Sequence, residues 1–178
     1  MKTILNIILV TFLIAISNSG CILNDTQKYI EDLKSENIMV KINAMYYLGK
    51  EKEKRAVPVL MILLSDDQPK ELKLSSINAL GEIGESIAVD ALIRMLNERD
   101  SDIKMAACNA LGMIRDPKAV KHLIRILDDK DIRLTAIWAL GNIGDKGAVP
   151  LLTRLLYDND KYVRYNASRS LQRIGNRE

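Results

Sequence analysis

The chain has 178 residues, of which 48% are hydrophobic and 28% are charged, so it can bury a core. Its formal net charge of +3 is too small to indicate a nucleic-acid partner. Aromatic residues make up only 4% of the chain. Close-packed helices built from Leu, Ile and Ala need little aromatic volume, whereas a globule with one enclosed core usually uses more. The composition therefore favours packed helices and excludes a basic nucleic-acid binder.

Residues 1–20 differ in kind from the rest of the chain. Lys2 is their only charged residue, and an apolar run extends from Ile4 to Ile16 with two polar interruptions. This run is shorter than the roughly 20 residues of a membrane-spanning helix, but it suits the hydrophobic region of a secretory signal. The segment resembles a bacterial lipoprotein signal, and Ser19-Gly20-Cys21 fits the small residues that precede a lipidated cysteine. Asn18 departs from that pattern, which expects an aliphatic residue there.

The resemblance implies cleavage before Cys21, lipidation of Cys21 and a short tether over residues 21–25. Several acyl chains would hold the protein on a membrane almost permanently, since each buried CH₂ contributes about 0.8 kcal/mol. We expect an extracytoplasmic protein that is lipid-anchored to a bacterial membrane, either the outer membrane or the periplasmic face. The alternatives are a secreted protein and one anchored by an uncleaved N-terminal segment.

From residue 26 onward the sequence repeats one unit. Each unit opens on an Ala-Val pair, at Ala56-Val57, Ala88-Val89, Ala119-Val120 and Ala148-Val149. Three of these units close on a Leu-Gly pair, at Leu80-Gly81, Leu111-Gly112 and Leu140-Gly141, and the last closes on Leu171-Gln172, in which glutamine replaces the glycine. A period of about 30 residues is typical of stacked supersecondary units.

Each unit is predicted to be a pair of helices with no strand. The first helix has apolar residues at helical spacing, as in Leu92, Met95 and Leu96, and a polar turn leads to a longer second helix. We predict five helical pairs, over about 25–50, 54–84, 86–115, 117–144 and 146–175. The expected fold is all-α, a right-handed α-solenoid that occupies residues 26–178. We expect the protein to be monomeric.

The second helices align on one basic residue in each unit, namely Lys41, Lys73, Lys104, Arg133 and Arg164. We expect these cations to pair with acids of their own or the neighbouring turn. Seven residues later comes a leucine, at Leu48, Leu80, Leu111, Leu140 and Leu171. Residues suited to an N-cap or a first turn precede the second helices, at Asn37, Pro69, Asp100, Asp129 and Asp160.

These columns resemble HEAT repeats, in particular the phycobilisome-lyase-like variety, over about residues 26–175. Ile132 to Gly144 and Arg164 to Gly175 match best. The end units depart from the pattern, with Lys50-Glu51-Lys52 and Gln172 where glycines are expected, and we interpret them as capping units. The resemblance implies an armadillo-type fold and says little about function.

The sequence offers no catalytic constellation, and we predict a protein that is not an enzyme. His122 is the only histidine and is expected on the surface, while Cys108 is expected in the core. Deoxyhypusine hydroxylases resemble this architecture but use His-Glu pairs to hold iron, and here His122 is followed by Leu123. We therefore expect no cofactor and no metal. No residue marks a tetrapyrrole site of the bilin-lyase type.

In HEAT-like proteins the second helices line the concave side, so the resemblance implies a groove there. The column five residues after the basic one would form its floor, with Tyr46, Asn78, Asn109, Trp138 and Arg169. Tyr, Trp and Arg are enriched at binding hot spots, although Trp138 could instead fill a packing gap. We predict a non-catalytic, membrane-tethered scaffold that binds a protein or peptide. The alternative is a lyase-like or enzyme-accessory factor that holds a chromophore or a modified protein substrate.

Overall fold

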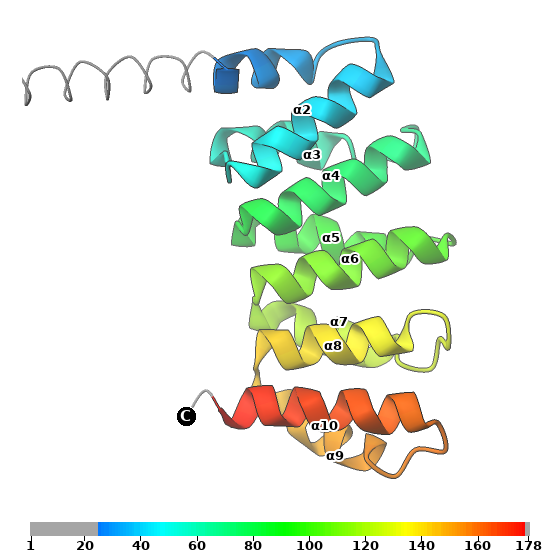
Figure 1. The fold of residues 1–178 in the computed structure, drawn as a ribbon. Coiled ribbons are helices and arrows are strands. Elements are labelled where there is room, and N and C mark those ends of the chain that lie inside the picture. The colour runs from blue at the N-terminus through cyan, green and yellow to red at the C-terminus, as the bar shows by residue number, and fades with distance from the viewer. Residues whose placement is uncertain (1–24, 177–178) are drawn as a thin grey trace, which may run out of the picture.

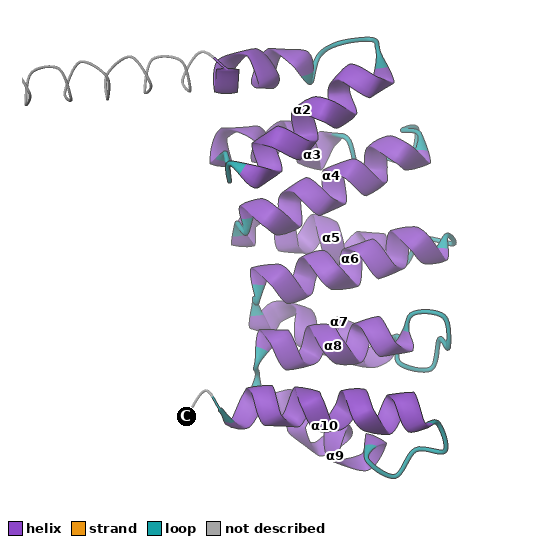
Figure 2. Ribbon diagram, viewed as in Figure 1, coloured by secondary structure: helices purple, strands orange, loops and turns teal. Residues whose placement is uncertain are grey.

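The computed structural model describes residues 25–176, and every regular element in this range is a helix (Figure 2). The predicted signal segment and Cys21 lie outside the described residues. Beyond a helical segment at 25–32, the second helices are α2 (Ile38–Lys50), α4 (Lys70–Ile83), α6 (Ser101–Ile114), α8 (Arg133–Ile143) and α10 (Lys161–Gly175). The first helices of the later units are α3 (Val57–Ile62), α5 (Val89–Met95), α7 (Val120–Arg125) and α9 (Val149–Leu155). The predicted solenoid of five helical pairs is confirmed.

The helices form two layers in one stack (Figure 1). Helices α2, α4, α6, α8 and α10 follow one another in the front layer, and α3, α5, α7 and α9 lie behind them. Helices α2, α4, α6 and α8 each pack on the next second helix, and α4, α6, α8 and α10 each pack on the first helix of their own unit. Contacts between adjacent helical units along the whole stack therefore replace a single enclosed core.

Each repeated Ala-Val pair marks the joint between a 3₁₀ turn and a first helix. The turns are Lys54–Ala56, Ser86–Ala88, Pro117–Ala119 and Lys146–Ala148. All four alanines are fully buried. A larger side chain would not fit this joint, so the repeated alanine reflects packing rather than chemistry.

The repeated Leu-Gly pair sets the spacing of the second helices. A Cβ atom added to Gly112 would lie 3.0 Å from the Ala139 Cα atom, and one added to Gly141 would lie 2.7 Å from the Ser170 Cα atom. Gly49 and Gly81 face the following helix in the same way. Only a residue without a side chain allows the helix backbones to approach this closely.

Cys108 lies in the core, as predicted, with no exposed surface. It shares its column with Met45, Ile77 and Ile137, which are all fully buried. Burial raises the pKa of the Cys108 thiol from 9.0 to about 12. This thiol is therefore a packing residue and is protonated at neutral pH.

Three of the five predicted caps act through their side chains. Those of Asn37, Asp100 and Asp160 accept hydrogen bonds from the first backbone N–H groups of α2, α6 and α10, and Pro69 precedes α4 without such a bond. Asp129 is wrong as the N-cap of α8, which begins at Arg133 after Ile132. The Asp129 carboxylate instead accepts from the Asp131 N–H in the preceding turn.

The basic column forms a ladder of ion pairs between successive units. The rungs are Lys73 with Glu98 at 3.2 Å, Lys104 with Asp129, and Arg133 with Asp158. In every rung the acid lies 25 residues after the base, in the turn of the following unit. The predicted pairing with turn acids is confirmed for these three cations, and each rung joins a second helix to the next unit. Of the other two members of the column, Arg164 donates to backbone carbonyls instead, and Lys41 forms no ion pair within residues 25–176.

Candidate functional site: the second-helix face

The outer surface of α2, α4, α6, α8 and α10 is here called the second-helix face. It holds all five predicted groove residues, one on each helix, at equivalent positions. Tyr46 is 62% exposed, the side chains of Asn78, Asn109 and Arg169 are also exposed, and Trp138 is half-buried. The structure therefore places these residues in a line along the stack rather than in one cluster.

A groove of about 550 Å³ lies between α2 and α4 on this face. Tyr46 and Lys50 line it from α2, and Asn78 and Glu82 line it from α4. Its floor includes Gly49, where the close approach of the two helices leaves no side chain. An aromatic ring, an amide and two opposite charges thus surround an open depression, which suits a polypeptide segment better than a small molecule that needs enclosure.

Aromatic stacking holds the N-terminal edge of this groove. The rings of Tyr29 and Tyr47 stack with centroids 4.8 Å apart, and the Tyr46 ring meets Tyr47 edge-on at 5.3 Å. Burial of the ring, followed by the nearby Tyr47, raises the pKa of Tyr29. Tyr46 is therefore braced on one side by Tyr47 and open on the other.

Trp138 both packs and remains accessible. A Cβ atom on Gly112 would lie 2.9 Å from the Trp138 Cζ3 atom, so the indole covers the gap that this glycine leaves on α6. The same side chain packs against the edge of the hydrophobic core while part of it stays exposed. Its position bridges α8 and α6 on the second-helix face.

Sequence reasoning missed an apolar strip on this face. Its members each follow the basic column by one residue, namely Ile42, Leu74, Met105, Leu134 and Tyr165. Leu134 is 37% exposed and Tyr165 is 62% exposed, and the other three are partly exposed. The signal was present, because all five units carry a large apolar residue at this position, but a helical stripe is usually read as core.

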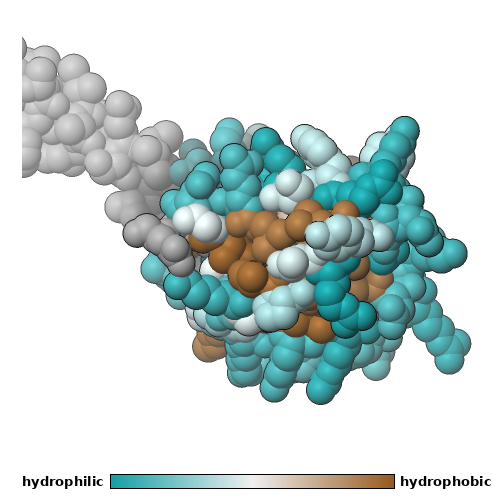
Figure 3. All heavy atoms as spheres, turned by 90° about the horizontal axis from the view of Figure 1, so that it is seen from below, coloured by the Kyte–Doolittle hydropathy of each residue, from teal (hydrophilic) through white to brown (hydrophobic). Residues whose placement is uncertain are grey.

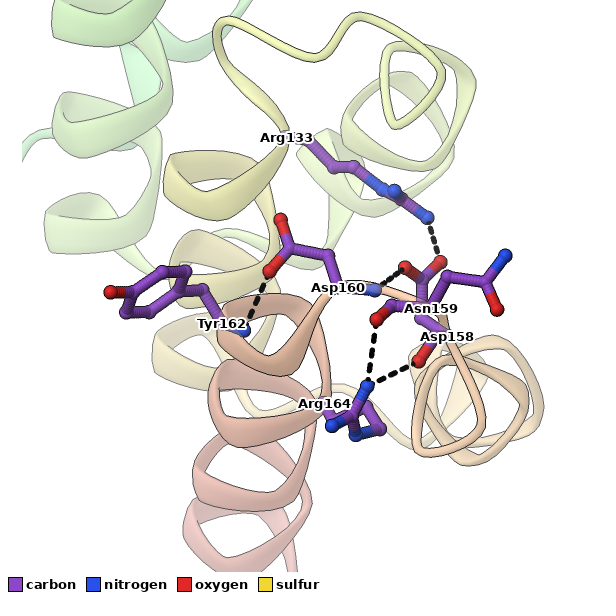
Figure 4. A network of polar contacts seen from close by, with 6 residues as sticks. All are labelled: Arg133, Asp158, Asn159, Asp160, Tyr162 and Arg164. Atoms are coloured by element: carbon purple, nitrogen blue, oxygen red, sulfur yellow. Dashed lines mark hydrogen bonds and ion pairs between the residues drawn. The ribbon is translucent and has the colours of Figure 1, made fainter.

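Hydrogen bonds fix the start of α10 beside this strip (Figure 4). Arg133 pairs with the Asp158 carboxylate, which also accepts from the Asp160 N–H at 2.9 Å. The Asp160 carboxylate accepts from the Tyr162 N–H at 2.8 Å, and Arg164 Nη1 donates to the carbonyls of residues 158 and 159. Figure 4 shows the Tyr162 ring projecting away from this network.

The metal-ligating and titratable side chains of the described residues are scattered along the stack. Residues 25–176 contain no group of three His, Cys, Asp or Glu side chains placed to hold a metal ion. His122 is half-exposed, and burial together with Lys121 and Arg125 lowers its pKa. None of the helices in this range is long and apolar enough to cross a bilayer.

A second surface lies at the end of the stack formed by α9 and α10. Figure 3 shows an apolar patch there with polar side chains around it. A depression of about 440 Å³ in this region is lined by Val149, Pro150, Leu171 and Ile174, with Lys146 and Gly175 at its border. The exposed Gln172 occupies the position that glycines hold in the inner units.

Comparisons with solved structures place the chain among helical solenoids. It is 26% identical to a chain of the complex of CpcE and CpcF of phycocyanin lyase from Nostoc sp. PCC7120, with a TM-score of 0.73. That match covers 85% of this chain and 65% of the other, so the chain spans less than two thirds of that relative. An engineered protein is 24% identical with a TM-score of 0.62, covering 91% of this chain and 82% of the other.

A designed armadillo repeat protein in complex with the peptide (KR)4 is 20% identical, with a TM-score of 0.65. That match covers 82% of this chain and 80% of the other, and it shows the fold alone. No curated protein matches the sequence. HEAT repeats match residues 62–132 and 128–178, which together are more than half of the chain. With its glycine seams, its ladder of ion pairs and this match, the chain belongs to the HEAT-repeat family.

Proposed function

We propose that this protein is a non-catalytic scaffold that binds a protein or peptide partner along the second-helix face. The observation that carries the proposal is the groove between α2 and α4, which contains two of the predicted contact residues, Tyr46 and Asn78. The apolar strip extends the same surface along all five second helices. A long face with apolar, aromatic and amide groups matches the composition of protein-binding surfaces.

A peptide-display selection on the full chain tests this proposal. The double variant Tyr46→Ala with Asn78→Ala removes two exposed side chains, so it should fold as the parent does. Hot-spot truncation typically costs about 2 kcal/mol or more, so affinity for a selected peptide should fall about 30-fold. The matched control is Tyr157→Ala with Asn159→Ala, both exposed in the turn after α9. Equal affinity in the two double variants would show that the groove is not the binding site.

The membrane tether is a separate part of the proposal. It rests on Ser19-Gly20-Cys21 and the apolar run before it, which lie outside the described residues. Cys21→Ala should abolish the incorporation of labelled fatty acid and release the protein from the membrane fraction. Membrane association that persists in this variant, without label in the parent, would contradict the tether.

A second candidate function is an accessory factor that holds a chromophore or a modified protein substrate. Its support is the likeness to the CpcE and CpcF complex of phycocyanin lyase, at 26% identity. The two proposals differ in a simple observation. A bound chromophore would give the full chain, purified from its own host, visible absorption, whereas a scaffold would be colourless.

A further inference from the structure

Charge is distributed unevenly along the second-helix face. Helix α10 has four basic residues and no acidic residue, and α8 has one basic residue and no acidic residue. Helices α4 and α6 each carry as many acidic as basic residues. The α8–α10 end is therefore the most positive pair of neighbouring helices on the face.

Two of these five cations form no ion pair, side-chain hydrogen bond or cation–π contact within residues 25–176. Arg133 is paired and Arg164 donates to backbone carbonyls, as Figure 4 shows. Lys161 Nζ lies 5.0 Å from the centroid of the Tyr162 ring. Arg169 is exposed and Arg173 is half-exposed, and neither forms an ion pair within residues 25–176. Their guanidinium groups are thus available to an external anion.

The same end of the face also carries exposed apolar groups. Leu134 and Tyr165 occupy equivalent positions on α8 and α10 and belong to the apolar strip. Tyr162, which is 57% exposed, lies one turn before Tyr165, and Trp138 lies one turn after Leu134. Arg169 follows Tyr165 by four residues, so both project from the same side of α10.

We propose that the α8–α10 end of the second-helix face binds an acidic peptide segment of a partner protein. The carboxylates of this peptide face Arg169 and Arg173, and one apolar side chain of the peptide lies over Leu134 and Tyr165. Arginine guanidinium groups bind carboxylates through paired hydrogen bonds, which fix direction as well as charge. This inference rests on the proposed function and names the chemistry of the partner.

A peptide suits this surface better than an anionic membrane does. The apolar strip runs across neighbouring helices as a line, which a single polypeptide segment can follow. The indole of Trp138 is held against Gly112 and half-buried, so it is not free to insert into a bilayer. Binding to anionic vesicles is the competing outcome of the test.

The test uses the full chain in detergent and three fluorescein-labelled synthetic peptides. Each peptide carries one Leu, surrounded by glutamates, by glutamines or by lysines. Two exposed Arg–carboxylate pairs should together make the glutamate peptide bind about tenfold more tightly than the glutamine peptide, and the lysine peptide should bind weakest. Trp138 is the only tryptophan in the chain, so its fluorescence reports binding at this end. Raising the ionic strength from about 0.05 M to about 0.5 M should weaken the glutamate peptide most.

Charge reversal at two positions locates the site. Arg169→Glu with Arg173→Glu should remove the preference for the glutamate peptide and favour the lysine peptide. The matched control Arg125→Glu with Arg154→Glu changes net charge equally on the first helices and should keep affinity within about twofold. An equal loss in both double variants, or a lysine peptide that binds as tightly as the glutamate peptide, would overturn the proposal. Helical circular dichroism of each variant shows that it is folded.

Vesicles of phosphatidylcholine with phosphatidylserine provide the competing arm. Co-sedimentation that depends on Arg169 and Arg173, without binding of the glutamate peptide, would overturn the proposal in favour of a lipid surface. A result that refutes the acidic-peptide proposal can be distinguished from one that refutes the scaffold function. Suppose that the parent selects only basic or neutral peptides and that Tyr46→Ala with Asn78→Ala no longer binds them. This result would support the scaffold function and refute an acidic partner.

Discussion

Replacing Gly141 by alanine tests the closest contact between second helices. The new Cβ atom would lie 2.7 Å from the Cα atom and 2.6 Å from the Cβ atom of Ser170. Neither atom can rotate away, so α10 must move as a whole. Ser170 Oγ also donates to the buried Ile137 carbonyl at 2.9 Å, which holds the two helices in place.

The expected loss follows from two opposing effects. Overpacking a close contact costs about 1–3 kcal/mol, and alanine in a helix gains about 0.5–1 kcal/mol over glycine. Because the contacted atoms are fixed to the α10 backbone, the overpacking cost lies in the upper part of this range, at about 2–3 kcal/mol. Gly141→Ala should therefore lower the free energy of unfolding by about 1–2.5 kcal/mol, and Tm by about 2–10 °C for a chain of this size.

Urea unfolding of the full chain measures this loss, followed by circular dichroism and by Trp138 fluorescence. The tryptophan lies on the same helix as Gly141, so it reports on the perturbed seam. Gly175→Ala is the matched control, because a Cβ atom there meets nothing within 4 Å. It should leave stability unchanged or slightly higher. A Gly141→Ala variant as stable as the parent would refute the close approach of α8 and α10.

Three further predictions concern buried and paired groups. Glu98→Ala leaves the buried Lys73 without its partner and should lower the free energy of unfolding by about 1–3 kcal/mol, whereas Glu98→Gln, which keeps an acceptor, should lose less in the same urea titration. The hydrogen bond from Lys104 lowers the pKa of Asp129 below 3.8, so its ionised form stabilises the fold above that pH and the benefit disappears as pH falls through the lowered pKa. Asp129→Asn should thus be less stable than the parent at neutral pH and converge with it in strong acid, and parallel curves at every pH would contradict this rung. In a variant whose other cysteine is replaced by serine, Cys108, with a pKa of about 12 and no exposure, should resist thiol reagents until denaturant is added.

Periodic features of the fold could be predicted from the sequence because packing imposes the same residue at the same position in every unit. The helix pairs, the buried Cys108 and the Leu-Gly seams all follow from this regularity. The start of α8 could not be predicted from it. Asp129 has the residue type of a cap, but its carboxylate holds the preceding turn and pairs with Lys104, so the helix begins later.

The second-helix face was only partly predictable for a related reason. The column from Tyr46 to Arg169 varies between units, and this variation distinguishes it from the structural columns. The apolar strip from Ile42 to Tyr165 is regular, so sequence alone does not separate it from the core. Trp138 is both a packing residue and a partly exposed residue of the face. Its packing depends on the space that Gly112 leaves on α6, in another unit, so the sequence of its own unit does not reveal it.

The constant 25-residue offset of the ion-pair ladder bears on how the chain folds. Each rung needs only two successive units, and no rung joins distant ends of the chain. The loops that must close are short and nearly equal, so the entropic cost of closing them is similar at every step. Folding can begin at any neighbouring pair of units and spread in either direction. During synthesis, tertiary contacts can therefore form once two units have left the ribosome, long before the last helix is made.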